Sequence, residues 1–169
     1  MRLLACVDVD YREDGSARTA ALLFQHWSDE LETELRLHTV PLAAPYEPGA
    51  FYKRELPCLL PVLEPLAPEL AAIVIDGYVT LDAEGSPGLG WHLFQALGGA
   101  VPVIGVAKTA FRGSAHAQAV QRGSALRPLY VTAAGIDVLD AAEHLRQMAG
   151  PYRMPTLLGR VDRACRAAV

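Results

Sequence analysis

Two carboxylates, Asp8 and Asp10, stand two positions apart at the end of the apolar stretch that begins at Leu3. A β-strand places residues i and i+2 on the same face, so both side chains point the same way if this stretch is a strand. Carboxylates are rarely buried unless they are paired or bound to a metal, and a divalent cation is the simplest partner. For Asp10 a solvated position in the turn 11–16 is favoured. For Asp8, which two valines flank, a functional role is favoured.

Two further charged residues close apolar runs. Asp76 stands near the end of the run 71–77, and Lys108 follows the run 101–107. Continuous apolar runs are typical of strands buried on both faces, and ligand sites in open α/β sheets lie beyond the carboxyl ends of such strands. If the strand that ends at Asp76 neighbours the first strand, Asp8 and Asp76 meet at one rim of the sheet.

Asp8, Glu55 and Asp76 form the candidate metal-binding trio. Carboxylate oxygens suit Mg²⁺ or Mn²⁺, and two such ions about 3.5–4 Å apart support phosphodiester cleavage. Glu55 has the alternative of pairing in solvent with a neighbouring basic residue. Lys108 is suited to contact a scissile phosphate, with a strand-end lysine reaching for water as an equal alternative.

Two other positions carry weaker signals. His92 lies in an expected helix, where a lone histidine is more often structural, although it can assist proton transfer near pH 7. The segment Pro45–Gly49 is a stiff loop that presents Tyr46. Such a loop can push into a base stack, and an ordinary turn with a packed tyrosine is the commoner alternative.

Composition indicates a folded chain. Its 169 residues suggest one domain, 1–169, and 51% of them are hydrophobic. The net charge of −4 lacks the basic balance usual in nucleic-acid-binding proteins. However, no acidic residue occurs from 85 to 136, and chance combined with a run of core elements is the alternative explanation for this locally basic segment. It contains Lys108, Arg112, Arg122 and Arg127.

The three cysteines, Cys6, Cys58 and Cys165, are widely spaced. Their spacing and odd number argue against zinc ligands or a disulfide framework and favour small buried residues in a reducing cytosol. The N-terminus enters a strand without a signal-peptide pattern, and no apolar run reaches the roughly 18–20 residues of a membrane helix. We therefore expect a cytoplasmic protein with no membrane partner and no obligate protein partner.

The hydrophobic pattern predicts an antiparallel meander followed by parallel strands, which together make a mixed α/β sheet with helices on both faces. The segment 31–40 alternates like a strand with one wet face, and the helix 50–66 is expected to be interrupted by Pro57 and Pro61. The link 113–125 has no assigned structure. The expected strands are 3–10, 17–27, 31–40, 71–77, 101–107 and 127–132, the loop is 41–49, and the remaining helices are 91–97, 138–149 and 159–168.

Several of these stretches, in this order, resemble the endonuclease V family of deoxyinosine-directed nucleases, which have a ribonuclease H-like fold. Any one of them is weak, but the ordered set is fairly specific. The stretches are Val7-Asp8-Val9-Asp10-Tyr11, Pro45-Tyr46-Glu47-Pro48-Gly49, Arg54-Glu55, Asp76-Gly77, Gly88-Leu89-Gly90-Trp91-His92, Ile104-Gly105-Val106-Ala107-Lys108, Arg127-Pro128-Leu129-Tyr130-Val131 and Tyr152-Arg153-Met154-Pro155.

The resemblance implies roles for individual residues. Asp8, Glu55 and Asp76 look like the metal-binding carboxylates of the family, and Lys108 looks like its active-site lysine. Substrate-binding positions are implied in the Tyr46 wedge loop and near the lesion pocket, at Tyr46, Pro48, Gly49, Gly77, Gly105 and His92. The implied reaction is Mg²⁺-dependent hydrolysis of the second phosphodiester on the 3′ side of inosine, which leaves 3′-hydroxyl and 5′-phosphate ends.

The chain also departs from the family pattern. A basic, histidine-bearing loop after the Asp-Gly pair is replaced by residues 78–84, which add Asp82 and Glu84, and the hairpin between Lys108 and Arg127 is much shorter. These departures favour a second hypothesis, a non-catalytic or weakly specific nucleic-acid-binding relative that keeps the fold. A third is an α/β domain whose acidic cluster is structural.

Overall fold

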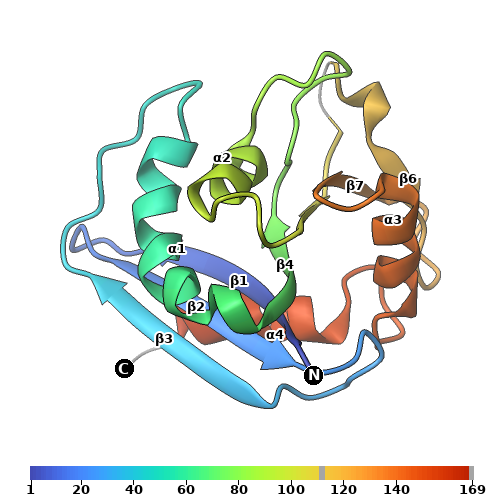
Figure 1. Cartoon of the computed structure of the whole chain (residues 1–169), viewed down its shortest axis with the longest axis horizontal. Coiled ribbons are helices and arrows are strands. Elements are labelled where there is room, and N and C mark those ends of the chain that lie inside the picture. The colour runs from blue at the N-terminus through green and yellow to red at the C-terminus, as the bar shows by residue number, and fades with distance from the viewer. Residues whose placement is uncertain (111–112, 168–169) are drawn as a thin grey trace.

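A mixed β-sheet forms the centre of the protein in the computed structural model, which describes residues 1–110 and 113–167 (Figure 1). Within these residues the sheet has seven strands in the order β3-β2-β1-β4-β5-β7-β6. The strands are β1 (Leu3–Tyr11), β2 (Ala17–Phe24), β3 (Glu34–Val40), β4 (Leu70–Asp76), β5 (Val103–Ala107), β6 (Gln118–Val120) and β7 (Leu129–Ala134).

The strand pairing confirms the predicted sheet. β1, β2 and β3 form an antiparallel meander, β4 runs parallel to both β1 and β5, and β7 pairs antiparallel with β5 and β6. In the β1–β4 ladder Val7 lies opposite Ile75. The residue after each of these is a carboxylate, so Asp8 and Asp76 leave neighbouring parallel strands at the same edge of the sheet.

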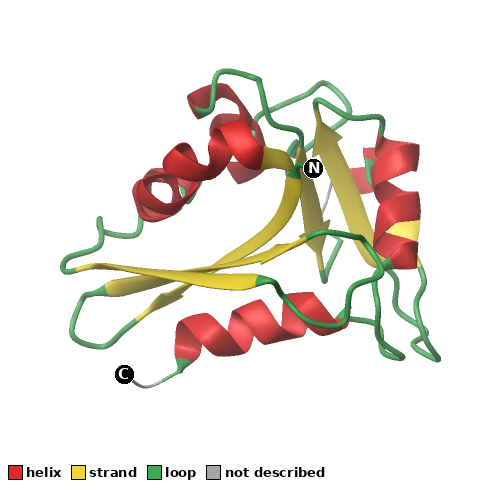
Figure 2. Ribbon diagram, turned by 60° about the horizontal axis from the view of Figure 1, so that its bottom comes forward, coloured by secondary structure: helices red, strands yellow, loops and turns green. Residues whose placement is uncertain are grey.

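Helices cover both faces of the sheet (Figure 2). α1 (Tyr52–Leu66) and α2 (Leu89–Ala96) pack on one face, and α3 (Val138–Gln147) and α4 (Thr156–Arg166) pack on the other. Because strand side chains alternate between faces, β1 contributes to both apolar layers. Ala5 and Val7 join the core beneath α1 and α2, whereas Leu4 and Cys6 join the core beneath α3 and α4.

The edge strand β3 differs from the prediction. Its alternation was expected to bury one face, but Leu35 and Leu37 are 42% and 45% exposed. They lie beside Leu22 and Ala20 of β2, whose side chains belong to the core on the α4 side. α4 packs over β1 and β2 and does not extend far enough to cover the edge strand.

The prolines of α1 do not interrupt the helix, contrary to the prediction. Pro57, Pro61 and Pro65 lie inside one continuous helix from Tyr52 to Leu66. Proline removes one backbone hydrogen bond, but the four-residue spacing places all three on a single exposed stripe. The carbonyl groups that lose their donors there can bind water instead.

Several other boundaries differ from the expected ones. β1 continues through Asp10 to Tyr11, so Asp10 lies in the strand and not in a solvated turn, and its carboxylate stands 3.9 Å from the Arg12 guanidinium. The second strand ends at Phe24, the link 113–125 contains the short strand β6, and the last helix begins at Thr156. The expected end of that helix at 168 lies outside the described residues, as does Arg112.

The structure also bears on the predictions for the cysteines and for membrane-spanning segments. The three cysteines are free and buried, as predicted. None of the helices in the described ranges is long and apolar enough to cross a membrane.

Gly105 fixes the close approach of β5 to the chain that follows β4. A Cβ atom built at this position would lie 2.4 Å from the Gly77 carbonyl oxygen and 2.9 Å from the Thr132 hydroxyl oxygen. Real Cβ atoms do not approach backbone oxygens so closely, so a side chain here would force the strand ends apart. The glycine therefore sets the geometry at the edge where Asp76 lies.

We predict that Gly105→Ala lowers the free energy of unfolding by about 1–3 kcal/mol, because overpacking a rigid backbone contact strains the sheet. Gly159→Ala is the matched control. Its added methyl group would meet only the flexible end of Arg163, and alanine is favoured over glycine in a helix by roughly 1 kcal/mol. Urea unfolding of both variants tests this, and a Gly105→Ala protein as stable as the wild type would contradict it.

Candidate active site

The carboxyl edge of β1 and β4 opens into a small cavity of about 60 Å³. Asp8 lines it from within β1, Asp76 from the end of β4, Lys108 from the residue after β5, and Asp162 from α4. The sheet topology alone brings the first three together, because the parallel strands β1, β4 and β5 are adjacent. The predicted meeting of Asp8 and Asp76 at one rim is thus confirmed.

Asp8 lies in an unfavourable place for a carboxylate. Loss of hydration on burial and the nearby charges of Asp76 and Asp162 raise its pKa from the ordinary 3.8 to about 7, although the backbone N–H of Val9 donates to Oδ1 at 2.9 Å and opposes the shift. A buried carboxylate beside like charges favours its neutral form unless a cation is near.

Asp162 was missed by the sequence interpretation. One carboxylate oxygen each of Asp8 and Asp162 and the Cys165 sulfur lie within 4.8 Å of one another. A weak signal was available in the sequence, because Asp162 stands four residues after Leu158 and so on the edge of the apolar stripe of α4. The Arg166 Nε donates to the Asp162 carboxylate at 2.9 Å.

Glu55 approaches the same edge from the first turn of α1. Its side chain is buried, with only 6% of the residue exposed. Burial and then the charges of Asp8 and Asp76 raise its pKa to about 8. Glu55 does not line the small cavity itself, but the charges of Asp8 and Asp76 act on its pKa, so it lies near both carboxylates.

Lys108 supplies positive charge at this cluster. It is exposed, lines the cavity together with Asp76, and lowers the pKa of Asp76 against the larger opposing effect of burial. The arrangement therefore presents one ammonium group beside converging carboxylates at a solvent-accessible edge.

A second pocket, of about 270 Å³, adjoins the first and shares Asp76 with it. Gly49 and Gly77 line its wall in left-handed backbone conformations, with φ of +78° and +121°. Aromatic and aliphatic side chains complete the lining, notably Tyr52, Tyr78 and Leu89. Such an apolar pocket with a few polar groups is suited to a planar ring.

His92 and Gly105 support this second pocket from behind. The imidazole of His92 stacks on the Tyr52 ring with the centroids 3.6 Å apart, and Gly105 packs against the Gly77 carbonyl. Neither residue lines the pocket. They contact Tyr52 and Gly77, which do line it, and so support the pocket wall.

Tyr46 is presented at the surface, with 61% of the residue exposed. Its ring lies 6.4 Å from the ring of Phe51, a residue of the second pocket, and Phe51 in turn contacts Tyr11 edge-on at 6.5 Å. Pro48 is exposed in the same loop. The loop thus projects an aromatic ring beside the mouth of the second pocket.

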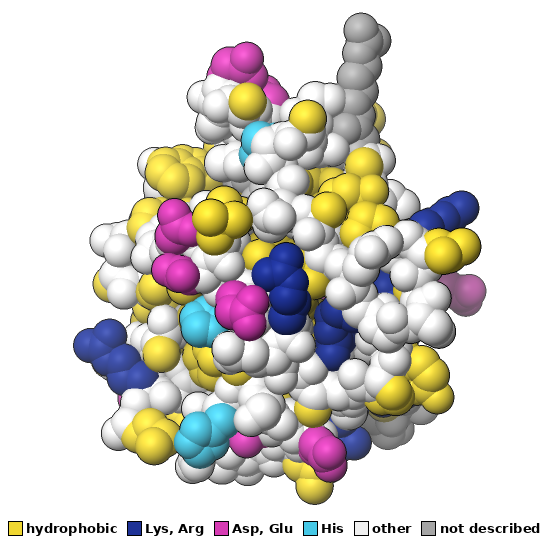
Figure 3. Space-filling model, turned by 90° about the vertical axis from the view of Figure 1, so that its right-hand side faces the viewer, with side chains coloured by type: hydrophobic (Ala, Val, Ile, Leu, Met, Phe, Trp, Pro, Cys, Tyr) yellow, Lys and Arg dark blue, Asp and Glu magenta, His cyan; other side chains and the backbone are white. Residues whose placement is uncertain are grey.

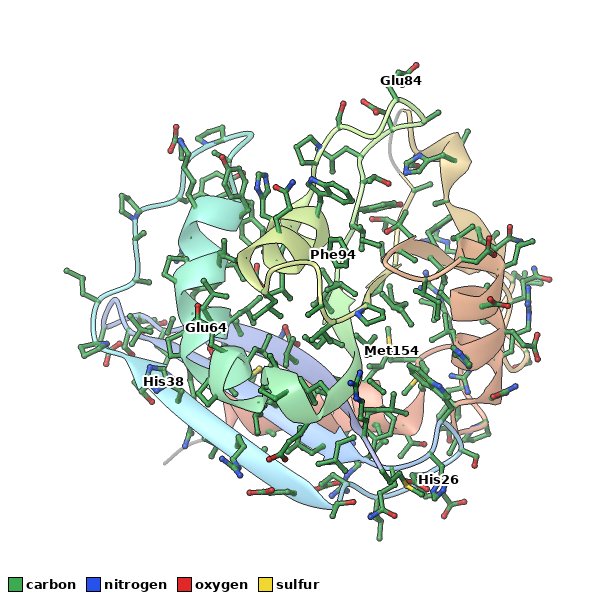
Figure 4. All side chains as sticks on the ribbon, in the orientation of Figure 1. His26, His38, Glu64, Glu84, Phe94 and Met154 are labelled. Carbon is green, nitrogen blue, oxygen red and sulfur yellow. The ribbon has the colours of Figure 1, made fainter. Side chains whose placement is uncertain are left out.

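The acidic loop that departs from the family pattern is closed by its own hydrogen bonds. Asp82 accepts from the Ser86 hydroxyl at 2.5 Å and from the Ser86 backbone N–H at 3.0 Å. The His116 ring contacts both the hydroxyl and the carbonyl of Thr80. Glu84 lies at the tip of this loop, away from the sheet (Figure 4).

The locally basic segment does not form one continuous basic surface. Arg122 is buried, with 7% exposed, and donates to backbone carbonyls of the loop after α3, whereas Lys108 and Arg127 are exposed. On the side of α3 and β6, basic, acidic and hydrophobic side chains are intermixed (Figure 3).

These features coincide with a known family. A family model described as Endonuclease V matches residues 1–135. The chain belongs to the Endonuclease V family. Curated relatives include Endonuclease V of Xanthomonas axonopodis pv. citri, 33% identical over 122 residues, and of Streptomyces avermitilis, 32% identical over 145 residues. The matches cover 72% and 74% of this chain, but only 50% and 62% of those relatives.

Solved Endonuclease V structures share the fold. The Bacillus subtilis protein aligns with a TM-score of 0.80 and 19% identity, covering 98% of this chain and 80% of that one. A Ciona intestinalis Endonuclease V, in complex with DNA containing an inosine, aligns with a TM-score of 0.81 and 17% identity, covering 98% and 84%. The architecture is therefore the ribonuclease H-like fold of this family, as predicted.

We predict that Asp8→Asn stabilises the chelator-treated protein. An acid whose pKa is raised on folding contributes stability that is present below its unfolded pKa, near 4, and is lost as the pH rises through the folded value, about 7. The asparagine amide cannot ionise, so the variant does not lose this stability as the pH rises. With about 1.4 kcal/mol per pKa unit as a guide, we expect a gain of about 1–3 kcal/mol at pH 8 and a smaller one at pH 4.

Urea unfolding in a chelating buffer at both pH values measures this gain. Asp10→Asn is the control, because Asp10 pairs with Arg12 and its replacement removes a favourable contact. An Asp8→Asn effect of equal size at pH 4 and pH 8 would show that charge repulsion is not its cause.

Proposed function

We propose that this protein is a metal-dependent endonuclease that hydrolyses a phosphodiester 3′ to deoxyinosine in DNA, or to inosine in RNA. The observation that carries the proposal is the convergence of Asp8, Asp76, Asp162 and Lys108 on one cavity, beside a ring-sized pocket that shares Asp76. We propose that residues 1–169 act as one such domain in the cytoplasm, with nucleic acid as partner.

The donor set fits a hard divalent cation. Asp8 and Asp162 bring carboxylate oxygens close together, and the raised pKa values of Asp8 and Glu55 mark sites where added positive charge is favourable. Asp8, Glu55, Asp76 and Asp162 would hold Mg²⁺ or Mn²⁺. When bound, such ions activate water and neutralise charge on the phosphate.

The remaining residues act on the nucleic acid. Lys108 stands where its ammonium group can contact the scissile phosphate, and Tyr46 can enter the base stack beside the second pocket. The pocket then receives the displaced base between Tyr52, Leu89 and the backbone at Gly49 and Gly77. Base and scissile phosphate are thereby held on opposite sides of Asp76.

A second candidate function is nucleic-acid binding without efficient cleavage. The observation that favours it is the segment 78–84, which adds Asp82 and Glu84 to a loop whose residues Tyr78 and Leu81 line the second pocket. Negative charge there repels the phosphate backbone, and the short link 113–125 offers little surface to compensate.

We predict that the protein nicks an oligonucleotide carrying one deoxyinosine at the second phosphodiester 3′ of the lesion, in Mg²⁺ or Mn²⁺ at low salt. Asp76→Asn should lower the rate by at least about 10²-fold, and Lys108→Ala by about 10²–10³-fold, because each removes charge that acts at the reacting phosphate. Asp140→Asn, at an exposed position of α3, should leave the rate unchanged.

Cleavage and binding of an unmodified oligonucleotide, measured beside the deoxyinosine substrate, separate the nuclease from the binding protein. Equal cleavage of both substrates would mean that the metal site works without lesion recognition. Retained binding with no cleavage of either would sink the enzyme hypothesis and favour the binding protein.

We predict that Tyr46→Ala slows cleavage of double-stranded substrate about 10-fold or more and affects single-stranded substrate less. A wedge is needed only where a base must leave a paired stack, and base–aromatic stacking is worth about 1–3 kcal/mol. Leu42→Ala is the control, since Leu42 is 78% exposed in the same loop and lacks an aromatic ring. Equal losses on both substrates would argue against a wedge.

A further inference from the structure

The backbone at Lys108 lies just beyond the sheet. The β5–β7 ladder pairs Ala107 with Tyr130 and ends there, and the β4–β5 ladder ends at Asp76 and Val106. Lys108 follows the last paired residue of both ladders, and Pro128, which has no N–H to donate, would face Thr109 in this register. Neither ladder extends to Lys108, so its carbonyl is open to a donor from outside the sheet.

Arg153 supplies that donor. One terminal nitrogen of its guanidinium, Nη2, donates to the Lys108 carbonyl and, at 3.0 Å, to the Pro128 carbonyl. A single cationic group thus joins the backbone next to the ends of β5 and β7, just beyond their last pair. The next residue, Met154, lines the cavity with Asp8, Asp76 and Lys108 and lies between β4 and α3 in Figure 4.

The segment that carries Arg153 is itself fixed. The buried Arg122 donates to the Met148 carbonyl at 2.6 Å, to the Gly150 carbonyl at 3.2 Å and to the Arg153 carbonyl at 3.4 Å. Gly123 passes so close that a Cβ there would lie 2.4 Å from the Pro151 oxygen. The link before β7 therefore holds the loop 148–153, and that loop holds Lys108.

We propose that Arg153 is the positioning residue for Lys108: its guanidinium joins the Lys108 carbonyl to the Pro128 carbonyl beyond the end of the ladder and sets where the lysine backbone leaves β5. This inference rests on the proposed function of Lys108. Its consequence is that the two residues act as one unit. A displacement of about 1 Å at a catalytic group can cost on the order of 10²-fold in rate.

A double-mutant cycle tests this coupling on the full chain. With the deoxyinosine oligonucleotide, Arg153→Ala should lower kcat about 10–100-fold and change KM less than about 3-fold. In the Lys108→Ala background the same substitution should change kcat less than about 2-fold, because the group being positioned is gone. Arg153→Lys, which keeps a cationic donor, should recover most of the loss.

Controls separate positioning from loss of the fold. Arg163→Ala removes an exposed arginine of α4 and should leave kcat within about 2-fold of the wild type. The rise in melting temperature on adding Mn²⁺ should be the same for Arg153→Ala as for the wild type. Equal losses of kcat from Arg153→Ala in both backgrounds would overturn the inference.

Hydrogen–deuterium exchange tests the positioning role of Arg153 without an activity measurement. In Arg153→Ala the peptide covering 106–110 should exchange at least about 5-fold faster, while peptides of β2 and those of Arg163→Ala remain unchanged. If the wild type cleaves no substrate, the proposed function fails, yet this measurement still tests the anchor. Unchanged exchange at 106–110 would refute the positioning role.

Discussion

Repulsion among carboxylates at one edge of the sheet is the constraint on which the site depends. Asp8 and Asp76 follow the last pair of the parallel β1–β4 ladder, and Glu55 and Asp162 approach from helices on opposite faces. The neighbouring carboxylates raise the pKa values of Asp8 and Glu55, so these two side chains are more costly to ionise than free acids. The fold can hold them together only because both faces of β1 and β4 are packed into large apolar layers. The repulsion at the edge lowers the free energy of unfolding, and burial of the two apolar layers offsets this loss, as is common at functional sites.

Parallel pairing explains why the charged residues gather at this edge. β1, β4 and β5 run side by side, so the residues that follow their carboxyl ends converge without any loop having to reach across the molecule. The antiparallel strand β7 lies on the far side of β5 and begins where β5 ends. Lys108 lies beyond the last pair of the β5–β7 ladder, and the loop from α3 to α4 binds its carbonyl through Arg153.

Much of this arrangement could be predicted from the sequence. The buried runs located β1, β4 and β5, and the positions of Asp8, Asp76 and Lys108 at their ends followed directly. Features that depend on distant neighbours could not be predicted. The exposure of Leu35 depends on where α4 stops, and the continuity of α1 depends on its prolines sharing one wet stripe. Asp162 was missed because its place at the edge of the apolar stripe of α4 is a weak signal that does not say which strand the residue faces.

The acidic balance of the chain is consistent with a nucleic-acid substrate once the charges are located. Carboxylates gathered at the sheet edge contribute negative charge that a divalent cation would neutralise on binding, and Arg122 contributes positive charge that already binds backbone carbonyls. Net charge therefore describes the substrate-facing surface poorly. A phosphate at this edge would contact the exposed Lys108 beside the carboxylate cluster. A base would contact the apolar pocket that shares Asp76 with the small cavity. Because the phosphate contact and the base contact are separate, a weakly acidic protein can contact a polyanion at one point without a basic surface around it.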